Sequence, residues 1–228
     1  MSRQSIREAI EQAFGEFAEI DSFVKEVREI RFPKGKVIYI PGDMSQSLYI
    51  VIKGLVSISR VTPNGRGVIL DYVSIHQFFG EEVLSGKEEI EGRWEVAETK
   101  QETVLAVVDK SLIIEHLFPN PHIMQKIMRV NLAKRQRFAA RLEILLHREV
   151  RVRLAALLLD LGRNYGVIQK DGTLLIDLIV PHHELARFIG ATRETVSATV
   201  SSFKTAGYVD NRGRKLLILK PVLLESLL

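Results

Sequence analysis

The chain of 228 residues contains no cysteine. This absence excludes a disulfide, a thiolate nucleophile, a zinc–thiolate site and a cysteine-ligated iron–sulfur cluster. No apolar run approaches the ~20 residues that a membrane helix needs, and charged residues interrupt the first segment, MSRQSIREAIEQAF, every few positions. We therefore expect a soluble cytoplasmic protein with no membrane partner.

Positive charge is scarce in the first half of the chain and abundant in the second. Residues 1–119 carry 14 Lys and Arg against 19 Asp and Glu, whereas residues 120–228 carry 18 against 9. A basic half in an otherwise acidic chain favours a polyanion such as nucleic acid as partner. A solvated basic surface without a partner fits the charge alone nearly as well.

Hydrophobic residues make up 46% of the chain, enough for one good core or two modest ones. Residues 3–19 have apolar residues at helical spacing and predict a short amphipathic helix. From Arg31 to about Val108 the pattern changes to short apolar runs such as VIYI, LYIVI and VILDYV. Turn residues such as Pro41-Gly42-Asp43 and Pro63-Asn64-Gly65 separate these runs. Strands joined by turns every 8 to 12 residues predict a compact antiparallel barrel or sandwich.

A long helix is expected next, because Asn120 and Pro121 are typical of a helix start and no glycine or proline follows before Gly162. From Pro121 to about His147 it would measure ~40 Å at 1.5 Å per residue. Such a helix outruns one small domain, so we expect it to pair with a second copy, although packing on its own barrel is the alternative. The residues assigned to pairing are Ile123, Ile127, Val130, Phe138, Leu142 and Leu145. With a hinge after this helix, the expected segments are residues 1–119, 120–148 and 149–228.

A helix-turn-helix is predicted from VPHHELARFIGATRETVSATVSSFK. The first helix would end at Gly190, and Thr192 would cap the second. In that second helix Val196, Val200 and Phe203 share one stripe, while the opposite side carries small and polar residues. A helix face without bulky side chains can enter the major groove of DNA.

Arg193 and Glu194 stand at the start of the second helix, where arginine can pair with guanine and glutamate can accept from cytosine. Together with Ser197 they are the predicted base readers, although Arg193-Glu194 could be a solvated pair. The following hairpin, YVDNRGRKLLILKP, resembles a basic wing. The residues expected at the DNA backbone are Thr192, Thr195, Ser201, Lys204, Arg212, Arg214 and Lys215. His182 and His183 are interpreted as capping or phosphate-contacting residues.

The stretch HELARFIGATRETVS, with its Gly-x-x-Arg-Glu-Thr-Val pattern, resembles the cyclic-AMP receptor protein/FNR family of bacterial transcription regulators. The turns at Gly42-Asp43 and Lys53-Gly54 and the run Phe79-Gly80-Glu81 are similar too. The resemblance implies an α+β protein with an N-terminal antiparallel β-roll like the cyclic-nucleotide-binding jelly roll. It further implies a long dimerisation helix and a C-terminal winged helix-turn-helix. Such a homodimer would read palindromic double-stranded DNA, with RNA polymerase as a further partner.

The resemblance also implies an effector site in the roll, formed by Gly80, Glu81, Glu82, Arg93, Trp94, Lys134 and Phe138. Members that bind cyclic AMP have serine after the arginine, whereas Trp94 follows Arg93 here. The intervening segment is also acidic, with glutamates at 88, 89 and 91. We therefore expect an anionic metabolite similar to 2-oxoglutarate, anchored by Arg93, rather than cyclic AMP. An internal salt bridge from Arg93 to Glu81 or Glu82, and a regulator that needs no effector, are the alternatives.

Other functions have weaker support in the sequence. A cupin-type enzyme would need a cluster of metal-binding histidines, whereas the predicted roll holds only His76, so we expect neither a metal site nor catalysis. Haem remains open because histidines stand at 76, 116, 122 and 147. An interaction module with a degenerate helix-turn-helix is also open. Ala198 replaces an arginine common in the family, which predicts looser specificity at one base pair.

Overall fold

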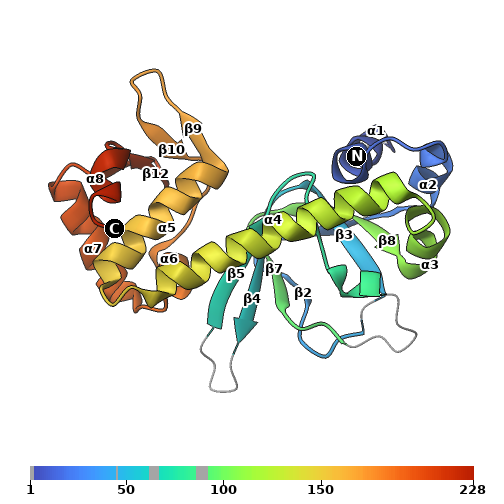
Figure 1. Ribbon diagram of the computed structural model, residues 1–228, viewed down its shortest axis with the longest axis horizontal. Coiled ribbons are helices and arrows are strands. Elements are labelled where there is room, and N and C mark those ends of the chain that lie inside the picture. The colour runs from blue at the N-terminus through green and yellow to red at the C-terminus, as the bar shows by residue number, and fades with distance from the viewer. Residues whose placement is uncertain (1–2, 45, 62–66, 86–91) are drawn as a thin grey trace. The chain divides into compact units, whose positions relative to one another are not determined.

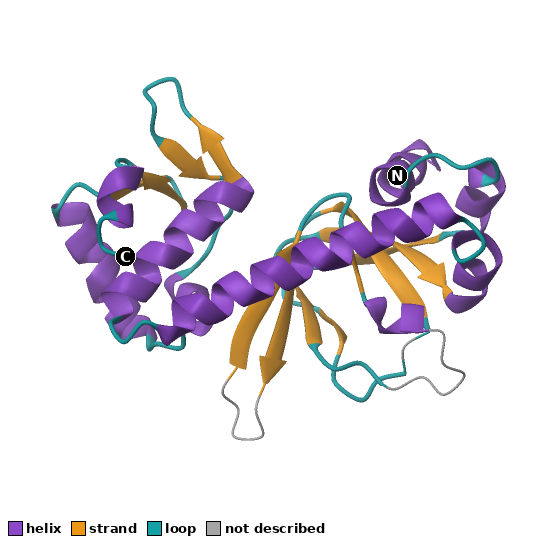
Figure 2. Cartoon of the chain, in the orientation of Figure 1, coloured by secondary structure: helices purple, strands orange, loops and turns teal. Residues whose placement is uncertain are grey.

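The computed structural model describes residues 3–44, 46–61, 67–85 and 92–228, and divides the chain into two compact units, residues 1–134 and 135–228 (Figure 1). Both units contain helices and antiparallel strands, which confirms the α+β class (Figure 2). The division falls inside the long helix, between Lys134 and Arg135. The predicted segment 120–148 therefore belongs partly to each unit.

The first unit begins with two helices, α1 (Arg3–Phe14) and α2 (Ile20–Glu26). The strands follow as β1 (Arg28–Phe32), β2 (Val37–Tyr39), β3 (Ser47–Lys53), β4 (Val56–Val61), β5 (Gly67–Val73), β6 (Phe78–Phe79), β7 (Val96–Thr99) and β8 (Thr103–Asp109). A 3-10 turn, η1 (Glu81–Ser85), follows β6. After β8 come the helical turn α3 (Lys110–Leu112) and the π turn η2 (Ile113–Leu117). The predicted turn at Pro63-Asn64-Gly65 and the glutamates at 88, 89 and 91 lie outside the described residues.

The strands form two antiparallel sheets with the orders β1-β8-β3-β6 and β2-β7-β4-β5. The register of β3 against β8 pairs Leu48 with Val108 and Ile50 with Ala106. Among the described strands, the register shifts in three pairings, β2–β7, β3–β8 and β4–β5. The predicted antiparallel roll is confirmed.

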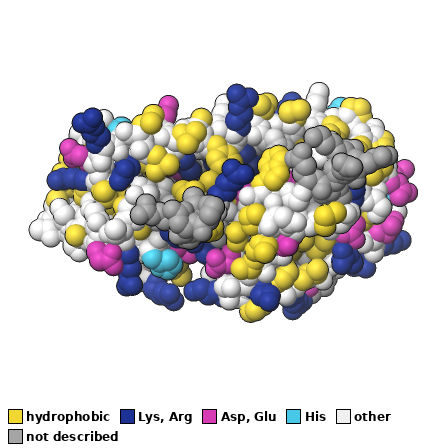
Figure 3. Space-filling model, turned by 90° about the horizontal axis from the view of Figure 1, so that it is seen from below, with side chains coloured by type: hydrophobic (Ala, Val, Ile, Leu, Met, Phe, Trp, Pro, Cys, Tyr) yellow, Lys and Arg dark blue, Asp and Glu magenta, His cyan; other side chains and the backbone are white. Residues whose placement is uncertain are grey.

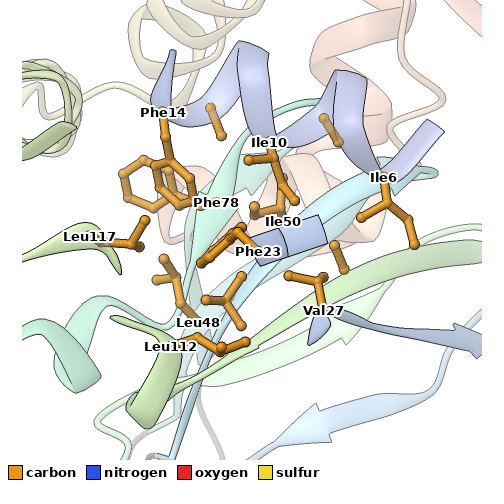
Figure 4. Close-up of a cluster of buried hydrophobic side chains, with 14 of the residues drawn as sticks. Ile6, Ile10, Phe14, Phe23, Val27, Leu48, Ile50, Phe78, Leu112 and Leu117 are labelled. Carbon is orange, nitrogen blue, oxygen red and sulfur yellow. The ribbon is translucent and has the colours of Figure 1, made fainter. Parts of the chain in front are cut away.

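The first sheet is buried on both faces because alternate residues of its central strands point to opposite sides. In β8, Val104, Ala106 and Val108 join a cluster with the helices, whereas Leu105 joins a second cluster that includes Val56 and Ala97 from the other sheet. Figure 4 shows the helical side of this core, where Ile6, Ile10 and Phe14 of α1 meet strand residues such as Ile50 and Phe78. Each fully buried large apolar side chain of this kind stabilises the fold by about 1.5–3 kcal/mol.

Helix α4 (Pro121–Leu146) matches the predicted long helix to within one residue. The side-chain oxygen of Asn120 accepts hydrogen bonds from the backbone N–H groups of His122 and Ile123, at 3.1 and 3.3 Å. These bonds satisfy two N–H groups that the helix start would otherwise leave without a partner, and Pro121 has no N–H to satisfy. The sequence therefore fixes where this helix begins.

The assignment of Ile123 and Ile127 to a pairing face is wrong. Both side chains are buried in the core of the first unit, with 1% and 4% of their surface exposed, and Val130 packs partly against the same core. The apolar positions at the start of α4 thus cover the chain's own roll, because that sheet would otherwise expose an apolar face to water. The alternative, packing of the helix on its own roll, holds for this part of α4.

The second unit contains α5 (Val150–Tyr165), α6 (His182–Ile189), α7 (Arg193–Thr205) and α8 (Pro221–Glu225). Its antiparallel sheet has the order β11-β12-β10-β9, formed by β9 (Gly166–Ile168), β10 (Leu174–Ile176), β11 (Val209–Arg212) and β12 (Lys215–Ile218). Helix α5 supplies a row of buried leucines, namely Leu154, Leu157, Leu158, Leu159 and Leu161. This helix forms contacts with α6, α7 and α8 and so holds the predicted helix pair in place.

Candidate functional site

The turn between α6 and α7 has the predicted local chemistry. Gly190 ends α6 in the left-handed conformation, with a φ of 60°, and Ala191 donates its N–H to the carbonyl oxygen of Ala186 at 3.0 Å. A residue without Cβ adopts this conformation at least cost. Thr192 then caps α7, since its Oγ1 accepts from the N–H of Thr195 at 3.2 Å. The helix-turn-helix geometry is confirmed.

Helix α7 has one buried face and one exposed face. Val196, Val200 and Phe203 have at most 1% of their surface exposed, as the sequence predicts. The exposed residues of the helix include Arg193, Glu194, Thr195, Ala198 and Ser201. The two longest and most polar of these, Arg193 and Glu194, stand at the N-terminal end. Their guanidinium and carboxylate can match the donors and acceptors of a base pair in the major groove.

The hydroxyl group of Ser197, a predicted base reader, already has a hydrogen-bond partner within the protein. Its Oγ lies 2.8 Å from Nδ1 of His182, the first residue of α6, and both side chains are partly buried. Burial, followed by the positive charges of Lys204 and Arg193, holds the pKa of His182 below its usual value of 6.5. The two residues are 15 positions apart, so only the crossing of the two helices brings them together. Sequence reasoning identified both but missed their contact.

The predicted wing is present as β11 and β12, which pair Arg212 with Lys215 around a turn at Gly213 and Arg214. Arg212 donates to Gln169 at 2.5 Å, and Lys215 forms an ion pair with Asp177. Arg214 is exposed at the turn. An exposed ion pair contributes about 0–1 kcal/mol and a hydrogen bond about 0.5–1.5 kcal/mol, so Lys215 and Arg212 can exchange these partners for phosphate at small cost.

Charge of both signs occurs on the molecular surface. On the face that Figure 3 shows, Lys and Arg side chains lie among acidic and hydrophobic ones. Net charge alone therefore does not locate a DNA-binding surface on that face. The polar side of α7 and the wing are candidates because of their geometry instead.

The predicted effector residue Arg93 lies inside the roll, and its guanidinium is engaged by three protein oxygens. Nη1 donates to the carbonyl oxygen of Gly80 and to Glu82, both at 2.9 Å, and Nη2 donates to the carbonyl oxygen of Ser47 at 2.6 Å. The guanidinium also lies 4.4 Å from the ring centroid of Tyr39. Gly80 has a φ of 86°, which favours glycine, and a Cβ there would lie 2.6 Å from Nη1, so any other residue would also displace the guanidinium.

Arg93 therefore has its counter-charge within the protein. The internal salt bridge to Glu82, considered as the alternative, is the contact observed. A buried guanidinium needs a counter-charge and acceptors, and Glu82 with two carbonyl groups supplies them. Trp94 points away, with 53% of its surface exposed, and only its backbone N–H meets Glu82, at 3.4 Å.

Two further charged residues face the same interior. Lys134 of α4 forms an ion pair with Glu81 and donates to the carbonyl oxygen of Phe78 at 2.6 Å. Burial, with added repulsion from Glu82 and Glu81, raises the pKa of Glu95 to about 7. Alternation along the chain places Glu95 on the same side as Arg93, but Glu95 was not among the residues predicted for the site. Phe138, also assigned to this site, is partly buried and belongs to the second unit.

Within the described part of the chain, no group of three or more His, Cys, Asp or Glu side chains could hold a metal ion. No helix among those residues is long and apolar enough to cross a membrane. His116, one of the histidines considered for haem, lies 3.0 Å from Glu19 through its Nδ1.

Comparison with known proteins gives two family matches. Residues 29–117 match the cyclic nucleotide-binding domain, and residues 152–227 match the Crp-like helix-turn-helix domain. The chain belongs to the CRP/FNR family of transcription regulators. The two matched ranges correspond to the roll and to the winged helix-turn-helix, so family and geometry agree on both parts of this CRP/FNR regulator.

Individual relatives within the family are distant. The chain is 28% identical over 199 residues to the CRP-like cAMP-activated global transcriptional regulator of Mycobacterium tuberculosis, covering 87% of each chain. It is 29% identical over 195 residues to the global nitrogen regulator of Nostoc sp., covering 85% of this chain and 86% of that one. A CRP-family regulator of known structure from Thermus thermophilus matches with a TM-score of 0.70 and 26% identity, covering 87% of this chain and 95% of that one.

Proposed function

We propose that this CRP/FNR regulator binds a palindromic promoter site as a homodimer, with one α7 in the major groove of each half-site. The observation that carries the proposal is the exposed N-terminal end of α7, where Arg193 and Glu194 project beside small side chains. Arginine can donate two hydrogen bonds to guanine and glutamate can accept from cytosine, which favours a half-site that contains G·C pairs. The protein acts by binding rather than by catalysis, and contact with RNA polymerase would carry the signal onward.

The DNA backbone contacts are assigned to the cap of α7, to its outer face and to the wing. Thr192, Thr195 and Ser201 would present hydroxyl groups, and Lys204 with Arg214 would present charge. Phosphate contacts of this kind fix the position of a protein on DNA without reading its sequence. Their expected signature is an affinity that falls steeply with salt.

Dimerisation is assigned to exposed apolar residues of α4. Met128, Leu132, Leu142 and Leu146 are at least half exposed, unlike Ile123 and Ile127. With the exposed residues Arg135 and Ala139 they follow alternating spacings of four and three along the sequence. This is the heptad spacing of a two-stranded coiled coil, in which a charged residue at one core position can fix the register. Leu142 is the one residue of the earlier pairing assignment that this row retains.

Selection of bound sequences from a pool of random duplexes tests the proposal. The expected result is a palindrome with half-site centres ~34 Å apart, bound by two chains. A single asymmetric site bound by one chain would overturn the homodimer. Binding that shows no sequence preference at any salt concentration would instead favour an interaction module with a degenerate helix-turn-helix.

We also propose that the roll responds to a small anionic effector, a dicarboxylate similar to 2-oxoglutarate rather than cyclic AMP. Arg93 and Lys134 support this proposal, because each is paired with a carboxylate that a ligand could replace. Replacing Glu81 would release Lys134, a residue of α4. Ligand binding in the roll would thereby change the contacts of α4, the helix that carries the proposed dimer contact.

Calorimetry with 2-oxoglutarate and cyclic AMP tests whether a ligand replaces these carboxylates. Glu82→Gln removes the competing charge but keeps an acceptor for Arg93, so it should bind the dicarboxylate more tightly than wild type. Wild type that binds neither compound and binds DNA fully without them would favour the effector-independent alternative. The internal pairing of Arg93 with Glu82 is the observation that favours this second candidate.

A further inference from the structure

The hydrogen bond between His182 and Ser197 joins the two helices of the helix-turn-helix. Nδ1 of His182 lies 2.8 Å from Oγ of Ser197. The histidine begins α6, and the serine stands in α7 one turn after Arg193. One side chain assigned to base reading is therefore held by a group that can change its charge near neutral pH. The inference drawn from this contact rests on the proposed function.

The protonation state of the ring decides what Ser197 can offer to DNA. A neutral imidazole has one donor and one acceptor nitrogen, so Nδ1 can either accept from the serine hydroxyl or donate to it. A charged imidazolium donates from both nitrogens. Ser197 must then accept from His182, and its own O–H group is left to donate outward. A serine restricted to donating favours acceptors such as guanine O6 and N7, thymine O4 or a phosphate oxygen.

The surroundings of His182 favour the neutral ring in the free protein. It is partly buried, and the charges that act on it from α7 are those of Lys204 and Arg193, both positive. On α6 itself the neighbouring His183 lies 3.9 Å from Glu184. DNA would bring phosphate charges of the opposite sign to this positive surface. An opposite charge nearby favours the charged form of a histidine.

We propose that His182 is a proton-dependent positioning residue of the DNA interface: its ring gains a proton when DNA binds and thereby fixes Ser197 as a hydrogen-bond donor. The histidine acts through the serine and need not contact a base. Two consequences follow for binding. The affinity for DNA rises as the pH falls, and the base preference at the position that Ser197 faces shifts toward hydrogen-bond acceptors.

The sign of the pH effect follows from linkage. Between the pKa of the free protein and the higher pKa of the complex, binding takes up a proton, so affinity increases toward lower pH. The slope is at most about tenfold per pH unit for each proton taken up. A homodimer can take up two. Outside this range both states carry the same number of protons and the slope is flat.

Fluorescence anisotropy of a labelled operator duplex and a random duplex, between pH 6 and 8.5 at constant ionic strength, tests the proposal. Wild type should gain at least about threefold in affinity across this range. His182→Gln keeps an amide that can meet Ser197 but does not titrate, so its profile should be flat. His122→Gln changes an exposed histidine of the first unit, outside the helix-turn-helix, so it is the control and should keep the wild-type slope. Ser197→Ala should lose the pH-dependent change in base preference.

A His182→Gln slope equal to that of wild type, with affinity retained, would overturn the role of His182 and leave the proposed function intact. Wild type that binds no DNA at any pH would overturn both. Should the variant fail to fold, NMR titration of the His182 ring in wild type decides. The expected result is a higher pKa in the complex than in the free protein, and an equal pKa would refute the inference.

Discussion

The guanidinium of Arg93 and the carboxylate of Glu82 form an ion pair inside the roll, with Nη1 and Oε2 2.9 Å apart and side chains only 2% and 10% exposed. Both charges have left water, so each depends on the other. Removing one partner of such a pair leaves an uncompensated buried charge, which is far more costly than the pair itself is stabilising.

Arg93→Met should therefore lower the free energy of unfolding by about 3–5 kcal/mol. The double variant Arg93→Met/Glu82→Gln should recover part of this loss, since no charge is then left without a partner. Urea denaturation measures both. Arg28→Met is the control, because Arg28 and Asp109 form an exposed pair at 2.8 Å that should contribute no more than about 1 kcal/mol. Equal losses in the two single variants would contradict this account.

Because the pKa of Glu95 is raised, the stability of the fold should depend on pH. Its pKa in the folded chain is raised to about 7 from an ordinary value of 4.5, so between these two pH values the folded chain holds a proton that the unfolded chain has released. Stability should therefore fall as the pH rises through this window. Glu95→Gln should remove this fall and melt at a higher temperature than wild type at pH 8. Parallel melting profiles of the two proteins from pH 5 to 8 would count against the assignment.

If α7 reads bases, its variants should lose DNA affinity in a way that depends on the DNA sequence. The variants Arg193→Ala and Glu194→Ala should each lose about 1–3 kcal/mol of binding free energy at the selected site, and each protein should tolerate more bases at one position. Gel shifts against the site and its single-base variants measure both effects. If the Arg193 variant lost affinity equally for specific and random DNA, arginine would not be a base reader.

If the wing contacts the DNA backbone, its variants should lose DNA affinity equally for all DNA sequences. Arg214→Ala should weaken binding to all duplexes and reduce the slope of log affinity against log salt by about one for each lost phosphate contact. Titrations at several salt concentrations give this slope. An unchanged slope together with altered base preference would move Arg214 from the backbone to the bases.

The exposed row on α4 predicts where dimerisation can be broken. Leu142, with 65% of its surface exposed, should lie at the contact between two copies, so Leu142→Asp would place two buried like charges there and yield monomers. Val222→Asp, an exposed apolar residue of α8, is the control and should remain dimeric. Light scattering at micromolar concentration separates the two, and a dimeric Leu142→Asp protein would exclude this face.

The sequence by itself determined the elements whose interactions are local. Asn120 caps α4, Gly190 ends α6 and Thr192 caps α7 through hydrogen bonds that span two to five residues. The buried stripe of α7 follows from helical spacing alone. Antiparallel strands were predictable in the same way, because alternation and turn residues repeat over short distances.

Tertiary structure decided the contacts between residues that are far apart in the chain. Helix α4 has apolar residues on more than one side, so its pattern could not tell that Ile123 and Ile127 face the roll while Leu142 faces water. Arg93 had two acidic candidates, and the path of η1 brought Glu82 rather than Glu81 to its guanidinium, leaving Glu81 to Lys134. His182 and Ser197 meet only because α6 and α7 cross. Periodicity fixes which residues share a face, whereas the packing of elements fixes what each face meets.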